Sequence, residues 1–189
     1  PQARFFAEGG FYHADRTARF VAPEVPALRS ETSASRPLRL NTGRIRDQWH
    51  TMTRTGMSPR LGQHLPEPFV EVHPDDALRF GVSDGSFARI TTDYGQCTLK
   101  VVVSPQQQRG MLFAPIHWSE ANATAARIGS LVAPFTDPFS GQPENKATPA
   151  SISPYEYVFA GFALARQPLQ MPDHAWWARV AVTGGYGYL

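Results

Sequence analysis

The sequence holds a single cysteine, Cys97, among its 189 residues. One thiol cannot form an internal disulfide, and it cannot supply the set of cysteines that a zinc site or an iron–sulfur cluster needs. The six histidines are scattered, and none stands at the i, i+4 spacing of a helical metal site. We therefore predict no metal site built from this chain alone, and we interpret Cys97 as a small core residue.

Long apolar runs and the common nucleotide-binding loops are also missing. No stretch approaches the about 18 apolar residues of a membrane-spanning helix, so none is predicted. There is no Gly-x-Gly-x-x-Gly or P-loop pattern, which excludes those two modes of nucleotide binding, and no Gly-x-Ser-x-Gly pattern. The net charge of +2 is small, so we expect neither nucleic acid nor a membrane as a partner. The chain begins at Pro1 without methionine, and we expect it to be a segment of a larger protein.

Proline and glycine are abundant, at 17 and 15 residues, and this favours short strands and turns over long helices. Six or seven short strands with one or two short helices predict a mainly β fold, a small mixed β-barrel with long irregular loops. Residues 36–165 are predicted to form the barrel domain. Residues 1–35 are predicted to be a hairpin and linker from a preceding domain, and residues 166–189 a C-terminal extension.

Strands are predicted where apolar residues alternate between turn signals. The expected strands cover residues 37–40, 69–73, 86–93, 96–103 and 110–115, one or two strands within 150–165, and a strand-like stretch with a Gly-Gly turn over 174–189.

Three further local predictions concern a hairpin and two helices. Residues 4–21 alternate loosely around a Gly-Gly pair, which is typical of a short hairpin. A helix is expected over residues 74–81, because Pro74 suits its first position and Gly81 ends it. A second short helix is predicted over residues 120–128.

Residues 40–54, called the ligand loop below, are rich in hydrogen-bond donors and poor in aliphatic side chains. Residues 41–43 are expected to break the preceding strand and open this loop. Such a segment is a poor core element, because every buried donor needs a partner to offset its desolvation. Six of the 18 basic residues fall within positions 36–60, against one acid, Asp47. Arginines suit phosphate oxygens, a tryptophan face suits a ring, and a glycine permits close backbone approach. The loop is therefore predicted to bind a polar, anionic, partly aromatic ligand, with a solvated arginine-rich loop as the alternative.

The segment TGRIRDQWHTMTR, at residues 42–54, resembles the start of the C-terminal domain of molybdenum oxidoreductases that carry a molybdopterin guanine dinucleotide cofactor. PIHWSEANA (residues 115–123) and DPFSGQPENKATP (residues 137–149) resemble two further parts of that domain. Within the family, the chain looks most like the catalytic subunit of assimilatory nitrate reductase, with formate dehydrogenase as the alternative.

The resemblance implies a double-psi β-barrel of six strands and a molybdenum bis(molybdopterin guanine dinucleotide) cofactor. It places His117 and Trp118 at a substrate funnel, although a structural role is the ordinary interpretation of a histidine such as His50 or His117 beside an aromatic residue. The residues that the resemblance places on the cofactor are Thr42, Gly43, Arg44, Trp49, His50, Thr51, Asn122, Gln142 and Lys146.

The residue that ligates the metal in such enzymes and the cysteines that hold their iron–sulfur cluster have no counterpart in this sequence. We therefore expect no catalytic residue in this chain, and we expect a cluster only in another part of the parent protein. The implied partners are the preceding domains of the catalytic subunit and nitrate, an anion that is reduced to nitrite in the cytoplasm. Two alternatives remain, a nucleic-acid-binding barrel that uses arginines and aromatic residues and a purely structural barrel.

Overall fold

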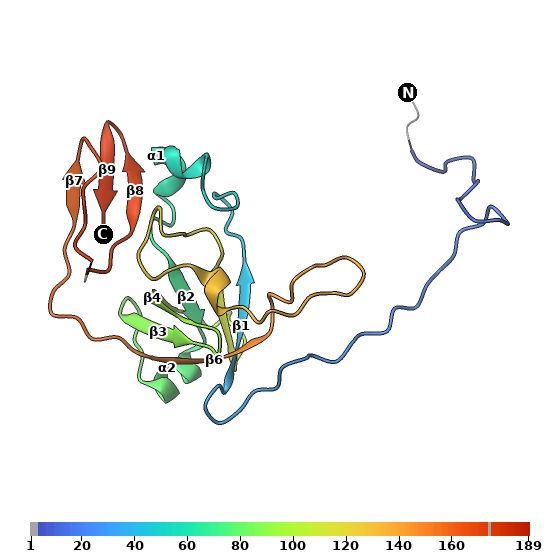
Figure 1. Ribbon diagram of the computed structural model, residues 1–189, viewed down its shortest axis with the longest axis horizontal. Helices are drawn as coiled ribbons and strands as arrows, with labels where there is room; N and C mark the ends of the chain where they lie inside the picture. Colours follow the sequence, from blue (N-terminus) through green and yellow to red (C-terminus); the bar gives the residue numbers. More distant parts are fainter. Residues whose placement is uncertain (1–3, 174) are drawn as a thin grey trace.

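A closed barrel of six strands forms the centre of the molecule (Figure 1). The computed structural model describes residues 4–173 and 175–189. Around the barrel the strands follow the order β1-β5-β2-β4-β3-β6. The pairs β1–β5 and β2–β4 are parallel, and the other neighbours are antiparallel. This confirms the predicted mainly β fold with a six-stranded, mixed barrel. The strands are β1 (Leu38–Gly43), β2 (Phe69–Val72), β3 (Phe87–Thr91), β4 (Gln96–Val103), β5 (Met111–Pro115) and β6 (Thr148–Pro154).

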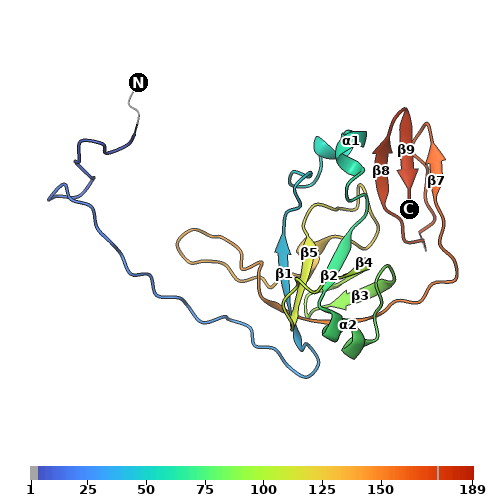
Figure 2. The same ribbon diagram turned by 180° about the vertical axis from the view of Figure 1, so that it is seen from behind.

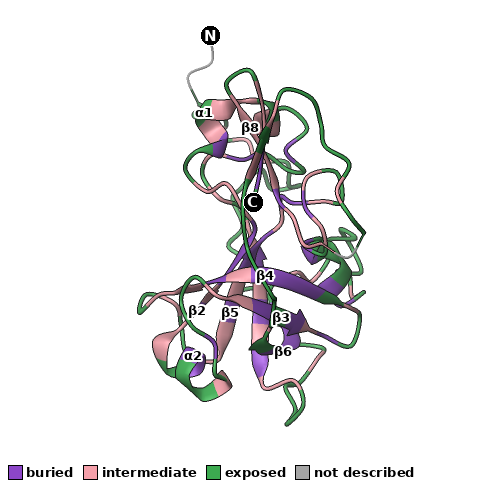
Figure 3. Cartoon of the chain, turned by 90° about the vertical axis from the view of Figure 1, so that its left-hand side faces the viewer, coloured by how far each residue is buried: buried purple, intermediate pink, exposed green. Residues whose placement is uncertain are grey.

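Alternating apolar residues fill the barrel interior. On β4, Cys97, Leu99 and Val101 are almost fully buried, while Val103 at the strand end is half-buried. Inward positions on the other strands are also aliphatic, so the strands share one continuous core. Figure 3 shows this buried band along the barrel strands. The predicted role of Cys97 as a core residue is confirmed.

Helix α2 (Pro74–Phe80) forms where the sequence predicts it. Pro74 occupies the first turn, and the His73 side chain accepts a hydrogen bond from the Asp75 amide at 3.1 Å. Gly81 ends the helix in the left-handed region, at φ 69°. The Asp76 carboxylate accepts from the Gly110 amide at 2.6 Å, which ties the helix to the turn before β5.

A second sheet of three strands lies beside the barrel, in the order β7-β9-β8 (Figure 1). It contains β7 (Ala163–Ala165), β8 (Arg179–Val182) and β9 (Gly185–Tyr188), so the barrel itself ends with β6. Gly184, at φ 79°, makes the predicted turn between β8 and β9, whereas His174 at the start of the predicted stretch lies outside the described residues. Helix α1 (Pro59–Gly62) packs so tightly on β8 that a Cβ on Gly62 would lie 2.6 Å from Val180 Cγ2.

The prediction of a hairpin over residues 4–21 was wrong. Residues 4–37 form no strand, and most of this segment runs away from the barrel (Figure 2), whereas Glu31 and Arg36 near its end form ion pairs with Arg39 and Asp93. Phe6 stacks on Phe11 at 4.7 Å, but Phe20 is fully exposed, because these apolar side chains have no sheet to cover. The first three residues of the predicted N-terminal segment lie outside the described residues.

The predicted helix over residues 120–128 was also wrong. The Asn122 and Ala123 amides both donate to the Ser119 carbonyl, which makes a turn. Ala123 then pairs with Ala178, and the Thr124 amide donates to the Trp177 carbonyl. Trp177 and Ala178 of the C-terminal segment thus bind backbone groups of residues 123 and 124, which in a helix would bond to neighbouring turns. Two short 3-10 helices complete the structure, η1 (Thr55–Met57) and η2 (Ile128–Leu131).

The expected break at residues 41–43 is absent as well, because β1 continues to Gly43 through its parallel pairing with β5. Among the described residues, no helix has the length and hydropathy needed to cross a membrane.

Candidate functional site

The ligand loop is a series of tight turns that leaves the end of β1. Two of its residues that are not glycine adopt left-handed backbone conformations, His50 at φ 45° and Met52 at φ 61°. Such conformations cost of order 1 kcal/mol and persist only where the surroundings impose them. Met52 is 7% exposed and joins the hydrophobic core, and Gln48 beside it is 6% exposed and accepts from the Thr55 hydroxyl at 2.7 Å. The buried side chains of Met52 and Gln48 therefore attach the ligand loop to the core and fix its backbone conformation.

His117 supplies the second anchor of the loop. The ring is fully buried, and its Nε2 accepts from the Ile45 amide at 2.9 Å, while its Nδ1 donates to the His50 carbonyl at 2.6 Å. These two partners require the neutral ring with the proton on Nδ1. Burial is the main cause that lowers the pKa of His117, with a smaller contribution from the charge of Arg44. Both ring nitrogens are thus engaged by backbone groups of the ligand loop.

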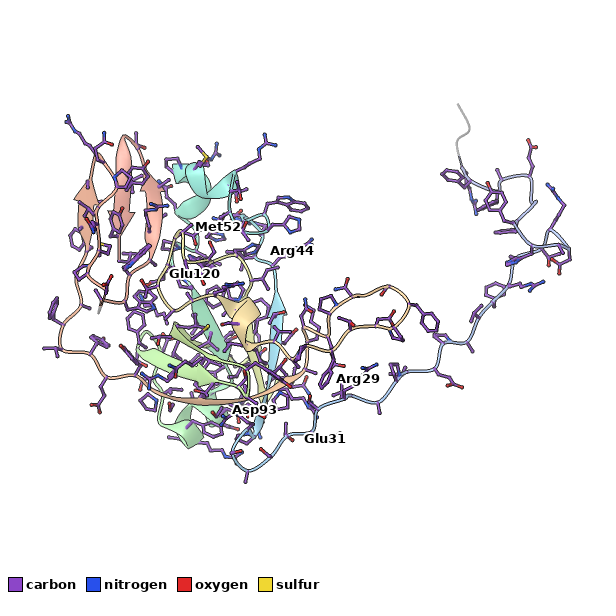
Figure 4. The ribbon with its side chains drawn as sticks, in the orientation of Figure 1. Arg29, Glu31, Arg44, Met52, Asp93 and Glu120 are labelled. Carbon is purple, nitrogen blue, oxygen red and sulfur yellow. The ribbon has the colours of Figure 1, made fainter. Side chains whose placement is uncertain are left out.

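Arg44 and Trp49 present the outer face of the loop (Figure 4 labels Arg44). The Arg44 guanidinium lies 5.2 Å from the centre of the Trp49 ring, and the ring of His50 meets Trp49 edge-on at 4.5 Å. Trp49 is 57% exposed, which is unusual for so large an apolar side chain. The structure brings these three predicted residues together as a cation beside two exposed rings.

Three of the six arginines in the predicted basic patch are paired with carboxylates. Arg36, Arg39 and Arg46 form ion pairs with Asp93, Glu31 and Asp47 at 3.0–3.3 Å. Hydrogen bonds from Arg46 and then from His64 hold the pKa of Asp47 below its usual range. The remaining arginines of the patch, Arg44, Arg54 and Arg60, have no carboxylate partner within the described chain.

Thr42 and Lys146 meet at the end of β1. The Thr42 hydroxyl donates to the Asn145 carbonyl at 2.8 Å, and the Lys146 ammonium donates to the Thr42 carbonyl. The Asn145 side-chain oxygen Oδ1 is buried and has no hydrogen-bond partner among the described residues. A buried amide oxygen without a donor is costly, so a ligand donor that reached this atom would offset that cost. Gly43 follows at a point of close contact, because a Cβ there would lie 2.7 Å from the Phe113 ring.

Gln142 stands apart from this cluster. It lies in an exposed turn in which Asp137 accepts from the Ser140 amide at 2.7 Å and from the Phe139 amide at 3.1 Å. The Ser140 amide, followed by the Ser140 hydroxyl, holds the pKa of Asp137 below its usual range. The Gln142 backbone bonds only within this turn, and its side chain is exposed. The structure therefore leaves Gln142 away from the other predicted residues.

Thr51, Trp118 and Asn122 line one cavity of about 670 Å³. Trp118 is 2% exposed, and the Asn122 side-chain oxygen accepts from the Ser119 amide at 2.8 Å. The opposite wall comes from β8 and β9 of the second sheet.

Comparison with known protein families gives a match over the barrel. The sequence model of the "Molydopterin dinucleotide binding domain" matches residues 38–149, the whole barrel up to the start of β6. The chain belongs to this family.

Members of the molybdopterin dinucleotide-binding family include large oxidoreductases. A protein described as "Nitrate reductase" from Klebsiella oxytoca is 44% identical over 173 residues, which is 92% of this chain and 20% of the relative. The "Assimilatory nitrate reductase catalytic subunit" of Bacillus subtilis (strain 168) is 29% identical over 153 residues, covering 80% of this chain and 21% of the relative. The "F420-dependent formate dehydrogenase 1 subunit alpha" of Methanococcus maripaludis is 34% identical over 116 residues, covering 61% of this chain and 16% of the relative. This chain thus spans about a fifth of the length of the nitrate reductases it matches.

The donor and acceptor set of the barrel fits a molybdopterin dinucleotide. Guanine and pterin share an amino-oxo pyrimidine edge with adjacent N–H donors, and the unpaired Asn145 Oδ1 is an acceptor of the kind that such an edge would need. Lys146 and Arg44 are cations of the kind that would suit a diphosphate, and the exposed Trp49 has a ring face that would suit a base.

Asn145 lies within residues 137–149, a segment that the sequence singles out, and its carbonyl accepts from the Thr42 hydroxyl. Three residues that line the cavity were not identified from the sequence. Arg166, Arg179 and Tyr186 line the cavity from outside the range of the family model. No local pattern connects them with the ligand loop, because the contact depends on how the second sheet packs against the barrel.

Proposed function

We propose that this chain is the molybdopterin guanine dinucleotide-binding domain of a cytoplasmic assimilatory nitrate reductase, whose parent subunit reduces nitrate to nitrite. The observation that carries the proposal is the cluster at the end of β1, where the Lys146 ammonium lies on the Thr42 carbonyl beside the unpaired, buried Asn145 Oδ1. This cluster offers a cation and an amide acceptor to one ligand, and a nucleotide has the matching diphosphate and base edge. The similarity to nitrate reductase over 92% of the chain supports the choice of enzyme.

In this proposal the barrel binds and orients the cofactor. Lys146 and Arg44 neutralise the diphosphate, Asn145 and Asn122 bind ring edges, and Trp49 covers a ring. The bound molybdenum cofactor supplies the redox chemistry, and its metal ligand and any iron–sulfur cluster belong to other domains of the parent. The isolated chain is therefore expected to bind nucleotide without turning over nitrate.

Of the two residues that the resemblance places at the substrate funnel, we assign only Trp118 to its lining. Trp118 borders the cavity and remains a candidate for its lining. His117 acts from behind, by holding the backbone of Ile45 and His50. We therefore propose that His117 shapes the funnel through the loop and does not contact nitrate.

Formate dehydrogenase is the second candidate, because the Methanococcus maripaludis relative is 34% identical over 116 residues. Exchanging this domain between the two kinds of enzyme distinguishes the nitrate reductase assignment from the formate dehydrogenase assignment. In one chimera this chain replaces the matching segment of the Klebsiella oxytoca nitrate reductase, and in the other that of the formate dehydrogenase. Nitrate reduction in the first with no formate oxidation in the second is the expected result, provided both chimeras contain cofactor. The opposite pattern would reject the nitrate assignment.

Cofactor binding is tested by titrating the chain with GDP and following its backbone amides by NMR, with ADP and poly-dT as controls. The isolated barrel provides only one side of the cofactor site, so we expect a dissociation constant in the millimolar range, roughly −4 kcal/mol. Shifts should centre on Thr42, Arg44, Asn145 and Lys146. Lys146→Gln should weaken binding about ten-fold, because it removes a charged donor, whereas the exposed control Arg60→Gln should not. Equal shifts with poly-dT would instead favour a nucleic-acid-binding barrel.

A further inference from the structure

The connection between the barrel and the C-terminal sheet is apolar and exposed. Residues 157–165, called the connecting strip below, have the sequence YVFAGFALA and carry no charge. All of their large side chains are exposed, and Val158 and Phe159 are 99% and 85% exposed. A continuous apolar surface of this kind marks a place that another protein surface covers.

The backbone of the connecting strip also has an open side. Its last residues, 163–165, form β7, which pairs with β9 and is an outer strand of its sheet. Figures 1 and 2, seen from opposite sides, both place β7 at the outer edge of the molecule. Within the described chain, residues 157–162 make no backbone–backbone hydrogen bond. An open edge of this kind is a template for pairing with a further strand.

The sequence of the connecting strip complements itself around Gly161. In an antiparallel pair of two identical strips centred on Gly161, each position faces the position equally far on the other side of that glycine. Each aromatic ring then faces an alanine, so large side chains meet small ones and the pair packs without crowding. The facing residues are Tyr157 and Ala165, Phe159 and Ala163, and Phe162 and Ala160, while Val158 faces Leu164.

The charges that flank the connecting strip match in the same register. Glu156 precedes the strip and Arg166 follows it, so each carboxylate faces a guanidinium of the other copy. Both side chains are exposed, and neither has an ion-pair partner among the residues that the structure describes. Opposite charges that face each other across two strands stabilise the pair, and like charges destabilise it. One register therefore satisfies both the apolar side chains and the charges.

We propose that the connecting strip binds the same strip of a second copy of this chain, antiparallel and centred on Gly161. Each β7 then gains residues 157–159 of the second copy as its outer neighbour, and the two three-stranded sheets join into one. A two-fold axis at Gly161 closes the assembly, because each strip is used once. The interface lies outside residues 38–149, the range of the family model, and it does not depend on the proposed cofactor function. The strip is short, so we expect a reversible dimer with a dissociation constant on the order of tens of micromolar.

Sedimentation equilibrium of the 189-residue chain tests whether the dimer forms. From about 1 to 500 μM, a range that brackets the expected constant, the average mass should rise from 20.9 kDa toward twice that value. Val158→Lys places a charge in the apolar pair and should weaken association at least about ten-fold. Val25→Lys is the matched control, because Val25 is a 92% exposed valine of the N-terminal segment, and it should leave association unchanged.

Exchange of the flanking charges tests the partner and the orientation. Glu156→Arg and Arg166→Glu each place like charges opposite each other, so each variant alone should associate about ten-fold more weakly. In an equal mixture of the two variants, opposite charges face each other again. The mixture should therefore associate to within about three-fold of the wild type. A mixture that associates no better than either variant alone would overturn the proposed register.

A cross-link tests the centre of the pair. No atom lies within 4 Å of a Cβ at Gly161, so Gly161→Cys fits the chain, and its thiol should face the same thiol of the second copy. Mild oxidation should therefore cross-link this variant. Val158→Cys is the control, because the two copies of residue 158 would lie six positions, or about 20 Å, apart along the strands. Cys97 is buried and should not compete.

Three results would overturn the inference. The first is a chain that stays at 20.9 kDa over the whole concentration range. The second is a dimer that Val158→Lys leaves unchanged, which would place the interface elsewhere. The third is growth into larger species with equal cross-linking at residues 158 and 161, which would show open-ended edge association in place of a closed pair. None of these results bears on the binding of GDP, so the inference and the proposed function fail separately.

Discussion

His117 and His50 are joined by a hydrogen bond of 2.6 Å from the buried imidazole Nδ1 to the backbone carbonyl. His50 is also one of the two loop residues with a left-handed backbone, at φ 45°. The bond therefore holds a conformation that the loop would not adopt alone. His117, which follows the end of β5, thus fixes the backbone of the ligand loop at His50, 67 positions earlier in the chain.

Replacing His117 should destabilise the protein and release the ligand loop. His117→Ala removes the partners of the Ile45 amide and the His50 carbonyl, and in this partly buried site each group left without a partner costs about 1–3 kcal/mol. Urea denaturation at pH 7.5 should show a loss of about 2–4 kcal/mol in the free energy of unfolding. The control His13→Gln changes an exposed residue of the N-terminal segment and should have no measurable effect.

The same histidine should make stability depend on pH. Burial lowers the pKa of His117 below the unfolded value of 6.5, so between the two values the unfolded chain binds more protons. The contribution is fully present above pH 6.5 and is lost as the pH falls through the folded pKa. Unfolding measured from pH 7.5 to 5 should show this loss in the wild type and a smaller one in His117→Ala. Parallel curves for the two proteins would contradict the assignment.

Gly43 should tolerate no side chain. In Gly43→Ala the new Cβ would lie 2.7 Å from Phe113 Cε2, so the ring or β1 must move, at a cost of about 1–3 kcal/mol. Gly129→Ala is the matched control, because no atom lies within 4 Å of a Cβ at that position. Thermal unfolding should separate the two variants. The double variant Gly43→Ala/Phe113→Leu should recover part of the loss, and no recovery would point to a cause other than this contact.

Strands and turns with strong local signals were predictable from the sequence. The strand over residues 96–103 has the predicted ends, because its apolar alternation lies between a Tyr-Gly turn and a loop. The helix from Pro74 was predictable for a similar reason, since its first residues and its terminal glycine favour the same structure. Thr42 and Lys146, which the family resemblance places on the cofactor, meet at the end of β1, a contact between residues 104 positions apart that no local pattern predicts.

Two of the errors fall where distant segments decide the structure, whereas the wrong hairpin over residues 4–21 falls where no sheet covers its apolar side chains. Asn41 and Gly43 have a weak strand propensity, but parallel pairing with Phe113 and Pro115 extends β1 through them. Residues 120–128 have a helical composition, but Ala123 pairs with Ala178 instead. The cavity and its two arginines depend on the same long-range packing, so no window of the sequence could have revealed them.

The hydroxyl of Thr42 should hold the segment that carries Lys146. Thr42→Val keeps the shape of the side chain and the bond from the Thr42 amide to the Asn145 carbonyl at 3.2 Å, but it removes the bond from the hydroxyl to the same carbonyl, at a cost of about 1 kcal/mol. Thr42→Ser keeps the hydroxyl and serves as the control. Limited trypsin digestion should cleave after Lys146 faster in the valine variant than in the wild type or the serine variant. Equal cleavage rates in all three proteins would show that the Thr42 hydroxyl does not restrain this segment.

Cys97 should be inert in the folded protein. Its side chain is 1% exposed, and burial raises the pKa of the thiol to about 11, against a smaller opposing effect of the Ser130 hydroxyl. The thiolate is the reactive form, so at pH 8 the native chain should react with DTNB at least about a thousand-fold more slowly than the chain in denaturant. In denaturant one thiol per chain should react, as the sequence requires.

Because the folded pKa of Cys97 lies above the unfolded value of 9.0, the thiol contributes stability below pH 9 that is lost as the pH rises toward 11. Cys97→Ala should reduce this alkaline loss, and rapid labelling of the native wild type would show that the barrel interior opens far more readily than its packing indicates.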